Sequence, residues 1–120
     1  MPGILTAPLP LGELSPMPIN PEWIMEGTPT ASGTIVMQSG DQKLSYGAWE
    51  CTAGKFQWVF SWDEFVHIQE GEVVIREEGG RTHHLRRGDL AHFPLGLKTV
   101  WQVPHYVRKV FTLRTPEPLV

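Results

Sequence analysis

The sequence predicts an all-β domain, a sandwich or a barrel built from many short strands. From residue 33 onward, runs rich in Val, Ile, Trp, Phe and Thr alternate with Gly, Asp and Pro. β-Branched and aromatic residues are those that strands favour. No window of about eleven residues repeats its apolar side chains with the helical period of 3.6. Short strands with turn residues at regular spacing are typical of an all-β sandwich or barrel.

Turn residues divide this region into a series of expected strands. They are residues 34–37, 43–51, 55–60, 63–70, 72–77, 81–86, 90–93, 98–103 and 106–113. The segment REEGGRTHH reads as a hairpin, because a Gly-containing turn joins two strands. Gly71 and Gly88 are expected at bends that need unusual backbone angles. Pro94 is expected to end the strand before it, because proline cannot donate to a ladder.

Residues 1–32 are predicted to form an extended arm ahead of a barrel domain of residues 33–120. Seven of the eleven prolines lie in residues 1–29, and proline blocks both helix interiors and sheet ladders. The arm nevertheless carries apolar side chains that favour burial: Ile4, Leu5, Leu9, Leu11, Leu14, Ile19, Trp23 and Ile24. We therefore expect the arm to lie on its own barrel or on a partner subunit, and we expect a homodimer.

Size and charge exclude several classes of protein. A chain of 120 residues is enough for one compact domain. The net charge of −3 gives no basic surface for nucleic acid or for an anionic membrane. No stretch approaches the roughly 20 apolar residues of a membrane span. The first sixteen residues lack Lys and Arg, unlike a signal peptide, so we expect a cytoplasmic protein.

One stretch, WVFSWDEFVHIQEG (residues 58–71), places large aromatic side chains and one acid on a single strand face. Side chains two residues apart point to the same face of a strand. Trp58, Phe60 and Trp62 therefore share a face with Glu64, and Val66 and Ile68 continue it. His67 has the opposite parity and is expected to point away from the interior.

Two motifs sharpen the predicted fold. In the first, EFVHIQEG, six residues separate Glu64 from Gly71; the second is GDLAHFPLG, from Gly88 to Gly96. In this order they resemble the two motifs of the cupin superfamily, over roughly residues 45–112. The resemblance implies a small double-stranded β-helix, the RmlC-like jelly-roll barrel of antiparallel strands, with the ligand site inside it.

Within the superfamily, the sequence is most similar to the ureidoglycine aminohydrolase-type cupin family. The matching segments are Trp62, DEFVHIQEGEV, GDLAHFPLG, TVWQV and VRKVF. Many single-domain members of that family have no assigned function, and the members that act as aminohydrolases use a metal. The resemblance therefore implies a barrel that handles small nitrogen-containing metabolites, without specifying the reaction.

The residues that cupins use to bind a metal are mostly absent from this chain. The paired histidines of the first motif would fall on Trp58 and Phe60, or in the longer spacing on Gln57 and Val59. The histidine of the second motif would fall on Thr99. Only Glu64 remains, and divalent transition metals need about three or four N, O or S donors. We therefore predict no metal and no cofactor, although a rearranged site using Glu64 with His92 is an alternative.

What remains is a tryptophan-rich pocket with one acid. Mostly apolar pockets with a few polar groups are the usual form of small-molecule sites. The candidate ligand-binding residues are Trp58, Phe60, Trp62, Thr99, Trp101 and Lys109, and Glu64 is the candidate catalytic residue. The aromatic side chains could instead pack the barrel solid. Indoles beside a carboxylate would also suit a cationic or planar ligand.

Glu64 itself has two interpretations. A buried carboxylate must be paired or protonated, so Glu64 could pair with Lys109 or Arg108, or accept a hydrogen bond from an indole N–H. Alternatively, it could act as a general acid or base, because burial against aromatic side chains favours the protonated form. The sequence thus predicts a small-molecule-binding barrel, with an enzyme of small nitrogen-containing metabolites or a partner-binding protein as alternatives. The lone Cys51 is expected to be a small buried hydrophobe.

Overall fold

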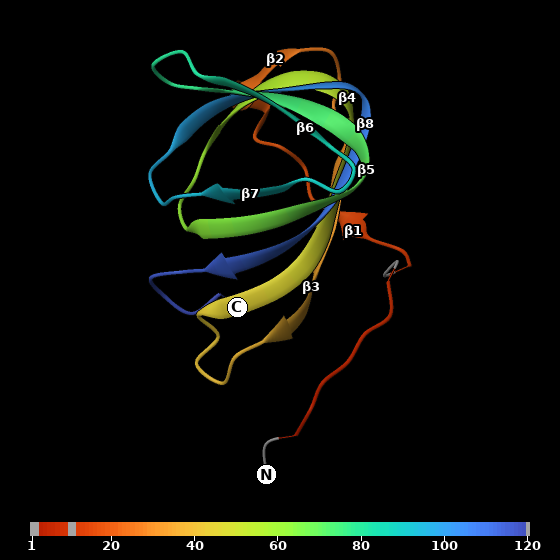
Figure 1. The fold of residues 1–120 in the computed structure, drawn as a ribbon, viewed down its shortest axis with the longest axis vertical. Helices are drawn as coiled ribbons and strands as arrows, with labels where there is room; N and C mark the ends of the chain where they lie inside the picture. Colours follow the sequence, from red (N-terminus) through yellow and green to blue (C-terminus); the bar gives the residue numbers. More distant parts are fainter. Residues whose placement is uncertain (1–2, 10–11, 120) are drawn as a thin grey trace.

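The computed structural model describes residues 3–9 and 12–119 of the chain (Figure 1). Its elements are the strands β1 (Ser15–Pro16), β2 (Ile24–Glu26), β3 (Ala31–Gln38), β4 (Leu44–Val59), β5 (Asp63–Glu77), β6 (Thr82–Arg86), β7 (Leu90–Phe93) and β8 (Lys98–Arg114), with a 3-10 helix η1 (Pro21–Trp23). Among the described residues, no helix is both long and apolar enough to cross a membrane.

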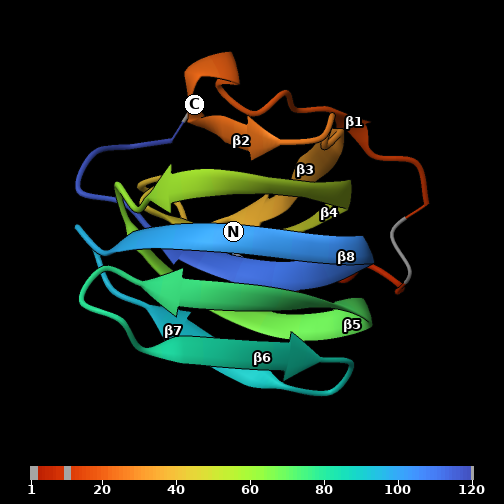
Figure 2. The same cartoon turned by 90° about the horizontal axis from the view of Figure 1, so that it is seen from above.

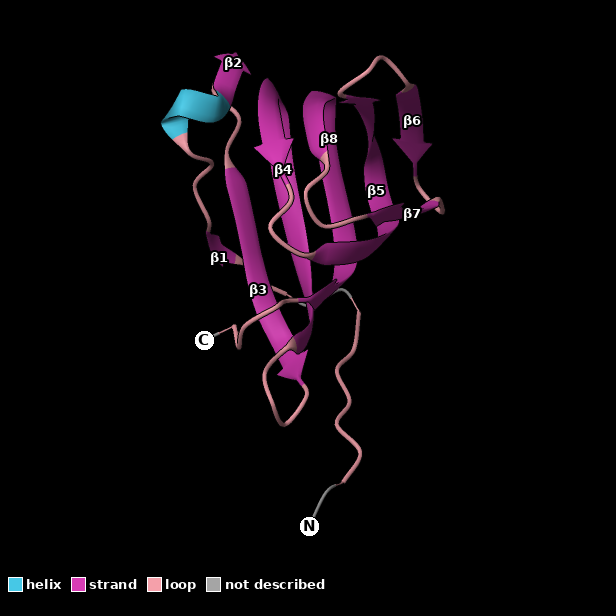
Figure 3. Ribbon diagram, turned by 90° about the vertical axis from the view of Figure 1, so that its left-hand side faces the viewer, coloured by secondary structure: helices cyan, strands magenta, loops and turns pink. Residues whose placement is uncertain are grey.

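The strands form one antiparallel sheet that curls into the predicted cupin-type jelly roll (Figures 1 and 2). The sheet order is β1-β3-β4-β8-β5-β6, with β2 also paired to β4 and β7 also paired to β5. Strands β4, β8 and β5 lie side by side at its centre (Figure 3). The all-β prediction is confirmed, and so is the hairpin between β5 and β6.

Several strands expected to be separate are continuous. The expected pair 43–51 and 55–60 forms the single strand β4, and 98–103 and 106–113 form β8. Each long strand bends through an irregularity in pairing instead of ending: the β4–β8 register shifts between Thr52 and Gly54. Pro104 lies opposite this shift, between the paired residues Val103 and Tyr106. Its missing N–H is tolerated there because bulges leave residues outside the ladder.

Gly71 acts inside a strand and does not end one. Strand β5 runs through it, and its pairing with β8 shifts between Gly71 and Val74. Its φ of 72° lies in the left-handed region that favours glycine. A Cβ at this position would overlap the carbonyl oxygen of Tyr106, so both the backbone angle and the close approach of β8 require glycine here.

The arm contains more regular structure than its prolines predict. Strand β1 pairs with β3, and β2 pairs with β4, so two short segments of the arm belong to the sheet. Ile19 is buried in the core. Residues 3–9, by contrast, lie outside the strands (Figure 1). Leu5 and Leu9 lie near Val36, Met37 and Tyr46 of β3 and β4, but Ile4 stays 93%, Leu5 68% and Leu9 50% exposed. Leu11, also expected to favour burial, lies outside the described residues.

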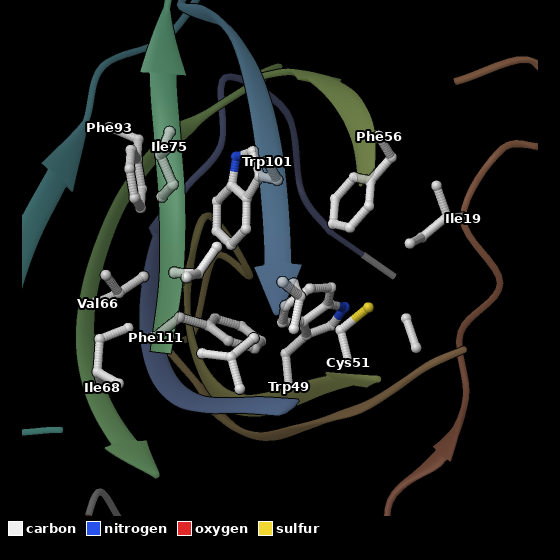
Figure 4. Packing of buried hydrophobic residues seen from close by; sticks show 14 of the residues in the cluster. Ile19, Trp49, Cys51, Phe56, Val66, Ile68, Ile75, Phe93, Trp101 and Phe111 are labelled. Atoms are coloured by element: carbon white, nitrogen blue, oxygen red, sulfur yellow. The ribbon is translucent and has the colours of Figure 1, made fainter. Parts of the chain in front are cut away.

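The core fills the inside of the curled sheet with aromatic side chains (Figure 4). Trp101 of β8 lies between Phe56 and Phe93, with ring centroids 6.0 and 5.6 Å away. Phe93 also stacks on Phe60 at 4.7 Å. Cys51 is fully buried, as expected. Stacked and tilted aromatic packing of this kind adds to the stabilisation from buried apolar area. Here it forms one wall of the adjoining cavity.

Candidate functional site

The inner face of the barrel encloses a cavity of about 410 Å³. Most of its lining is apolar, and the two charged residues in the lining are Glu64 and Lys109. The complete lining is Met17, Ile35, Trp49, Phe56, Trp58, Trp62, Glu64, Trp101, Lys109, Phe111, Leu113 and Leu119. The cavity thus combines a large aromatic surface with one acid and one base.

Strand pairing brings these side chains together. Strand β4 supplies Trp49, and its partner across the ladder is Lys109 of β8. Further along the same two strands, Phe56 pairs with Trp101. Strand β5 supplies Glu64 from the other side of β8, opposite Leu113. Because inward positions alternate along each strand, the three central strands all direct this set into the barrel.

Glu64 and Lys109 form a buried ion pair. The Lys109 ammonium donates a hydrogen bond to Glu64 Oε2, and the Trp62 indole N–H donates to Glu64 Oε1 at 2.9 Å. The residues are only 4% and 6% exposed. The buried carboxylate of Glu64 therefore has both of the partners that the sequence suggested: a positively charged side chain and an indole N–H. Arg108 lies elsewhere and pairs with Glu50, with 3.1 Å between Nη1 and Oε1.

The ammonium of Lys109 lies among aromatic rings. Its Nζ is 4.8 Å from the ring centroid of Trp49 and 4.9 Å from that of Trp101, with Phe111 at 6.0 Å. Ring faces attract cations, and the attraction grows when water is excluded. An indole-rich pocket beside an acid would suit a cationic ligand. In this protein the ammonium group of Lys109 takes that place.

The residues present do not fit the metal that cupins bind. The side chains at the positions of the first-motif histidines are Trp58 and Phe60, and the carboxylate of Glu64 is engaged by Lys109 and Trp62. Within residues 3–9 and 12–119, no three His, Cys, Asp or Glu side chains lie close enough to hold a metal ion. A single ion-paired carboxylate falls short of a transition-metal donor set.

The alternative metal site, formed by Glu64 with His92, does not fit the structure either. His92 pairs with Phe65 in the β5–β7 ladder, whereas Glu64 pairs with Phe93. Directly opposite residues share a face, so His92 lies on the other face of the sheet from Glu64. Its ring stacks on Phe65 with 4.4 Å between centroids. His67 is likewise exposed, on the face expected from its parity.

The sequence-predicted residues divide into two groups. Trp58, Trp62, Glu64, Trp101 and Lys109 all line the cavity. Two other candidates, Phe60 and Thr99, are buried outside its lining. Phe60 packs against Phe93 and Trp101.

Thr99 holds two of the lining tryptophans in place. Its hydroxyl donates to the carbonyl oxygen of Trp58 at 2.8 Å and accepts from the Trp101 indole N–H at 3.0 Å. The second bond gives a partner to the buried indole N–H of Trp101, and a buried donor without a partner costs free energy. Thr99 therefore lies outside the cavity lining and fixes the positions of Trp58 and Trp101 within it.

Sequence reasoning missed several lining residues. Trp49 has the same strand parity as Cys51, and Phe111 has the same parity as Lys109. The alternation of side chains within β4 and β8 could therefore have predicted that both residues face inward. The apolar residues Met17, Ile35 and Leu119 come from the arm, strand β3 and the C-terminal segment. Leu119 is held over the cavity because its carbonyl oxygen accepts from Gln38 Nε2 at 2.6 Å and its N–H donates to the Gln42 carbonyl at 2.8 Å. Only the fold reveals these contacts.

Comparison with known proteins identifies the domain. The family model of the EutQ-like cupin domain matches residues 38–111. The EutQ protein of Clostridium difficile superposes with a TM-score of 0.70 at 21% identity, over 89% of this chain and 83% of that one. A Salmonella typhimurium protein described as ethanolamine utilization protein Q gives 0.63 at 24%, over 71% and 69%.

A protein of unknown function from Pseudomonas syringae superposes with a TM-score of 0.78 at 24% identity. The alignment covers 86% of this chain and 45% of the Pseudomonas protein. No curated protein matches the sequence. At these identities the structural likeness establishes the jelly-roll fold, while the family match rests on residues 38–111.

Proposed function

This chain belongs to the family of EutQ-like cupin domains, and we propose that it binds a small molecule in the cavity of its barrel. The observation that carries the proposal is the cavity itself. Its volume of about 410 Å³ falls within the roughly 300–1,000 Å³ of small-molecule sites. A mostly apolar wall with a few converging polar groups is also the usual form of such sites. An interior packed solid by its tryptophans would have left no such space.

Binding without turnover is supported better than catalysis. Glu64 already holds Lys109 and Trp62, so its oxygens are engaged before any ligand arrives. A general base needs to reach the proton that it removes. The resemblance to ureidoglycine aminohydrolase-type cupins favours an enzyme that uses Glu64 as acid or base. Turnover of an amine- or carbonyl-bearing compound that is lost in Glu64→Gln while the fold is kept would support that alternative.

The proposal is tested by a series of two-ring aromatic compounds that includes uncharged, anionic and cationic members. Indole N–H signals in two-dimensional NMR report on Trp58, Trp62 and Trp101, which line the cavity. We expect at least one member of the series to shift these signals saturably. Trp58→Ala should weaken binding by at least about 1 kcal/mol, or roughly fivefold, through lost aromatic contact.

The matched control is Phe65→Ala, because Phe65 is an exposed aromatic residue away from the cavity lining. It should leave the affinity unchanged. If no compound of any charge shifts the lining indole signals, the proposed function is wrong. Ethanolamine is titrated separately from this series, because one structural relative is described as an ethanolamine utilization protein.

We also propose that the chain forms a homodimer through residues 3–9 of the arm. Ile4, Leu5 and Leu9 are at least half exposed, and exposed apolar side chains gathered in one short segment are candidates for a protein–protein contact. A second copy would give residues 3–9 a surface on which to bury these side chains.

A further inference from the structure

We propose that the cavity selects uncharged ligands, because Glu64 and Lys109 neutralise each other inside it. The inference rests on the proposed function and names the chemical class of its ligand: a two-ring, largely apolar molecule with one hydrogen-bond acceptor. Within the lining, Glu64 and Lys109 are the charged residues. Each of them is already paired with the other, so neither offers a free opposite charge to an ionic ligand.

A cationic ligand would meet a site that is already filled. Aromatic faces beside a carboxylate suit an ammonium group, and here that group is Lys109, 4.8 and 4.9 Å from the rings of Trp49 and Trp101. A second ammonium would have to displace Lys109 from Glu64 or lie beside it. Like charges repel strongly beside a group as buried as Lys109, which is 6% exposed, because the effective dielectric constant there is lower than in water.

An anionic ligand faces the mirror-image problem. It could lie beside the carboxylate of Glu64, where like charges repel. Otherwise it would have to take the ammonium away from Glu64, which is 4% exposed and would keep only the hydrogen bond from Trp62. A buried carboxylate without a counter-charge is strongly unfavourable. The cavity therefore penalises either sign of added charge, while it leaves neutral molecules unaffected.

A neutral ligand can use everything that remains. An ammonium group has three donors, and Glu64 accepts one from Lys109. A hydroxyl, carbonyl or amide oxygen on the ligand could accept another. The rest of the wall suits an apolar body: a cavity of about 150 Å³ in another protein holds benzene, so one of about 410 Å³ has room for two fused rings.

The test uses three ligands that share one ring system and differ in charge. They are 2-naphthalenemethanol, 2-naphthoate and 2-naphthylmethylammonium, titrated into the full chain at pH 7 by calorimetry. We expect the alcohol to bind at least tenfold more tightly than either ion. If either ion binds as tightly as the alcohol, the inference is wrong even though the proposed function stands. If none of the three binds, the inference is wrong. The proposed function is then tested separately by the wider series of aromatic compounds.

Two single variants should change the preference in opposite directions. Lys109→Met leaves the carboxylate of Glu64 in the cavity, so the ammonium ligand should gain at least tenfold relative to the alcohol. Glu64→Gln leaves the ammonium of Lys109, so the naphthoate should gain by a similar factor. The double variant carries neither charge and should still prefer the alcohol. If one single variant fails to fold, the other still tests the expected change of preference. An unchanged charge preference in both single variants would overturn the proposal.

Discussion

Replacing Lys109 by methionine is expected to lower the free energy of unfolding by about 3–5 kcal/mol. Methionine keeps much of the apolar stem of the side chain and removes only the charged end. Glu64 would then be left 4% exposed with one remaining side-chain donor, the Trp62 indole at 2.9 Å. Removing one partner of a buried ion pair is costly because the other charge stays buried without compensation.

The double variant Lys109→Met, Glu64→Gln supplies the matched control. Glutamine retains an oxygen that can accept from Trp62, and neither position carries a charge. Replacing a buried pair by uncharged residues of similar volume is often nearly neutral, so we expect the double variant to recover most of the lost stability. The coupling between the two positions should exceed about 2 kcal/mol, since contacting residues are not additive.

The assay is urea unfolding followed by tryptophan fluorescence and by far-ultraviolet circular dichroism, analysed by linear extrapolation. Total stabilities of small domains are about 5–15 kcal/mol, so the single variant should lose a large fraction of the whole. The reasoning is refuted if Lys109→Met costs less than about 1 kcal/mol, or if the double variant is no more stable than the single one.

Three further predictions follow from other parts of the molecule. Gly71→Ala should prevent folding or cost more than about 3 kcal/mol, because backbone strain adds to a clash with Tyr106; Gly79→Ala, whose Cβ would meet nothing within 4 Å, should cost only about 1–2 kcal/mol of strain. Burial raises the pKa of the Cys51 thiol from 9.0 to about 12, so the unfolded chain ionises first as pH rises. Stability should therefore fall between pH 9 and 12, by about 2 kcal/mol at pH 10.5, and Cys51→Ala should reduce that fall in paired urea titrations. Removing residues 2–9 should convert a dimer into a monomer in light scattering after size exclusion, and a monomeric full-length chain would contradict the proposed interface.

Much of the candidate site was accessible from local pattern. Strand parity placed Trp58, Glu64 and Trp101 inward. The resemblance to the cupin motifs showed that the positions of the metal-binding histidines carry other residues. Parity failed at Phe60, where β4 has ended and the chain turns toward Trp62. The alternation of side chains holds only within a strand, so the ring of Phe60 packs behind the wall and not in it.

The residues by themselves determined an all-β cupin barrel, its turn glycines and an interior rich in tryptophan with a single candidate acid. These features are local, since they depend on side-chain alternation, turn chemistry and motif spacing. Only the tertiary structure decided that Glu64 meets Lys109 and not Arg108, and that the aromatic faces surround the protein's own ammonium. Both facts depend on the register between β4, β8 and β5. A shift of one residue would turn Lys109 outward and Arg108 inward, and that register is set by bulges and by long-range packing that no local segment specifies.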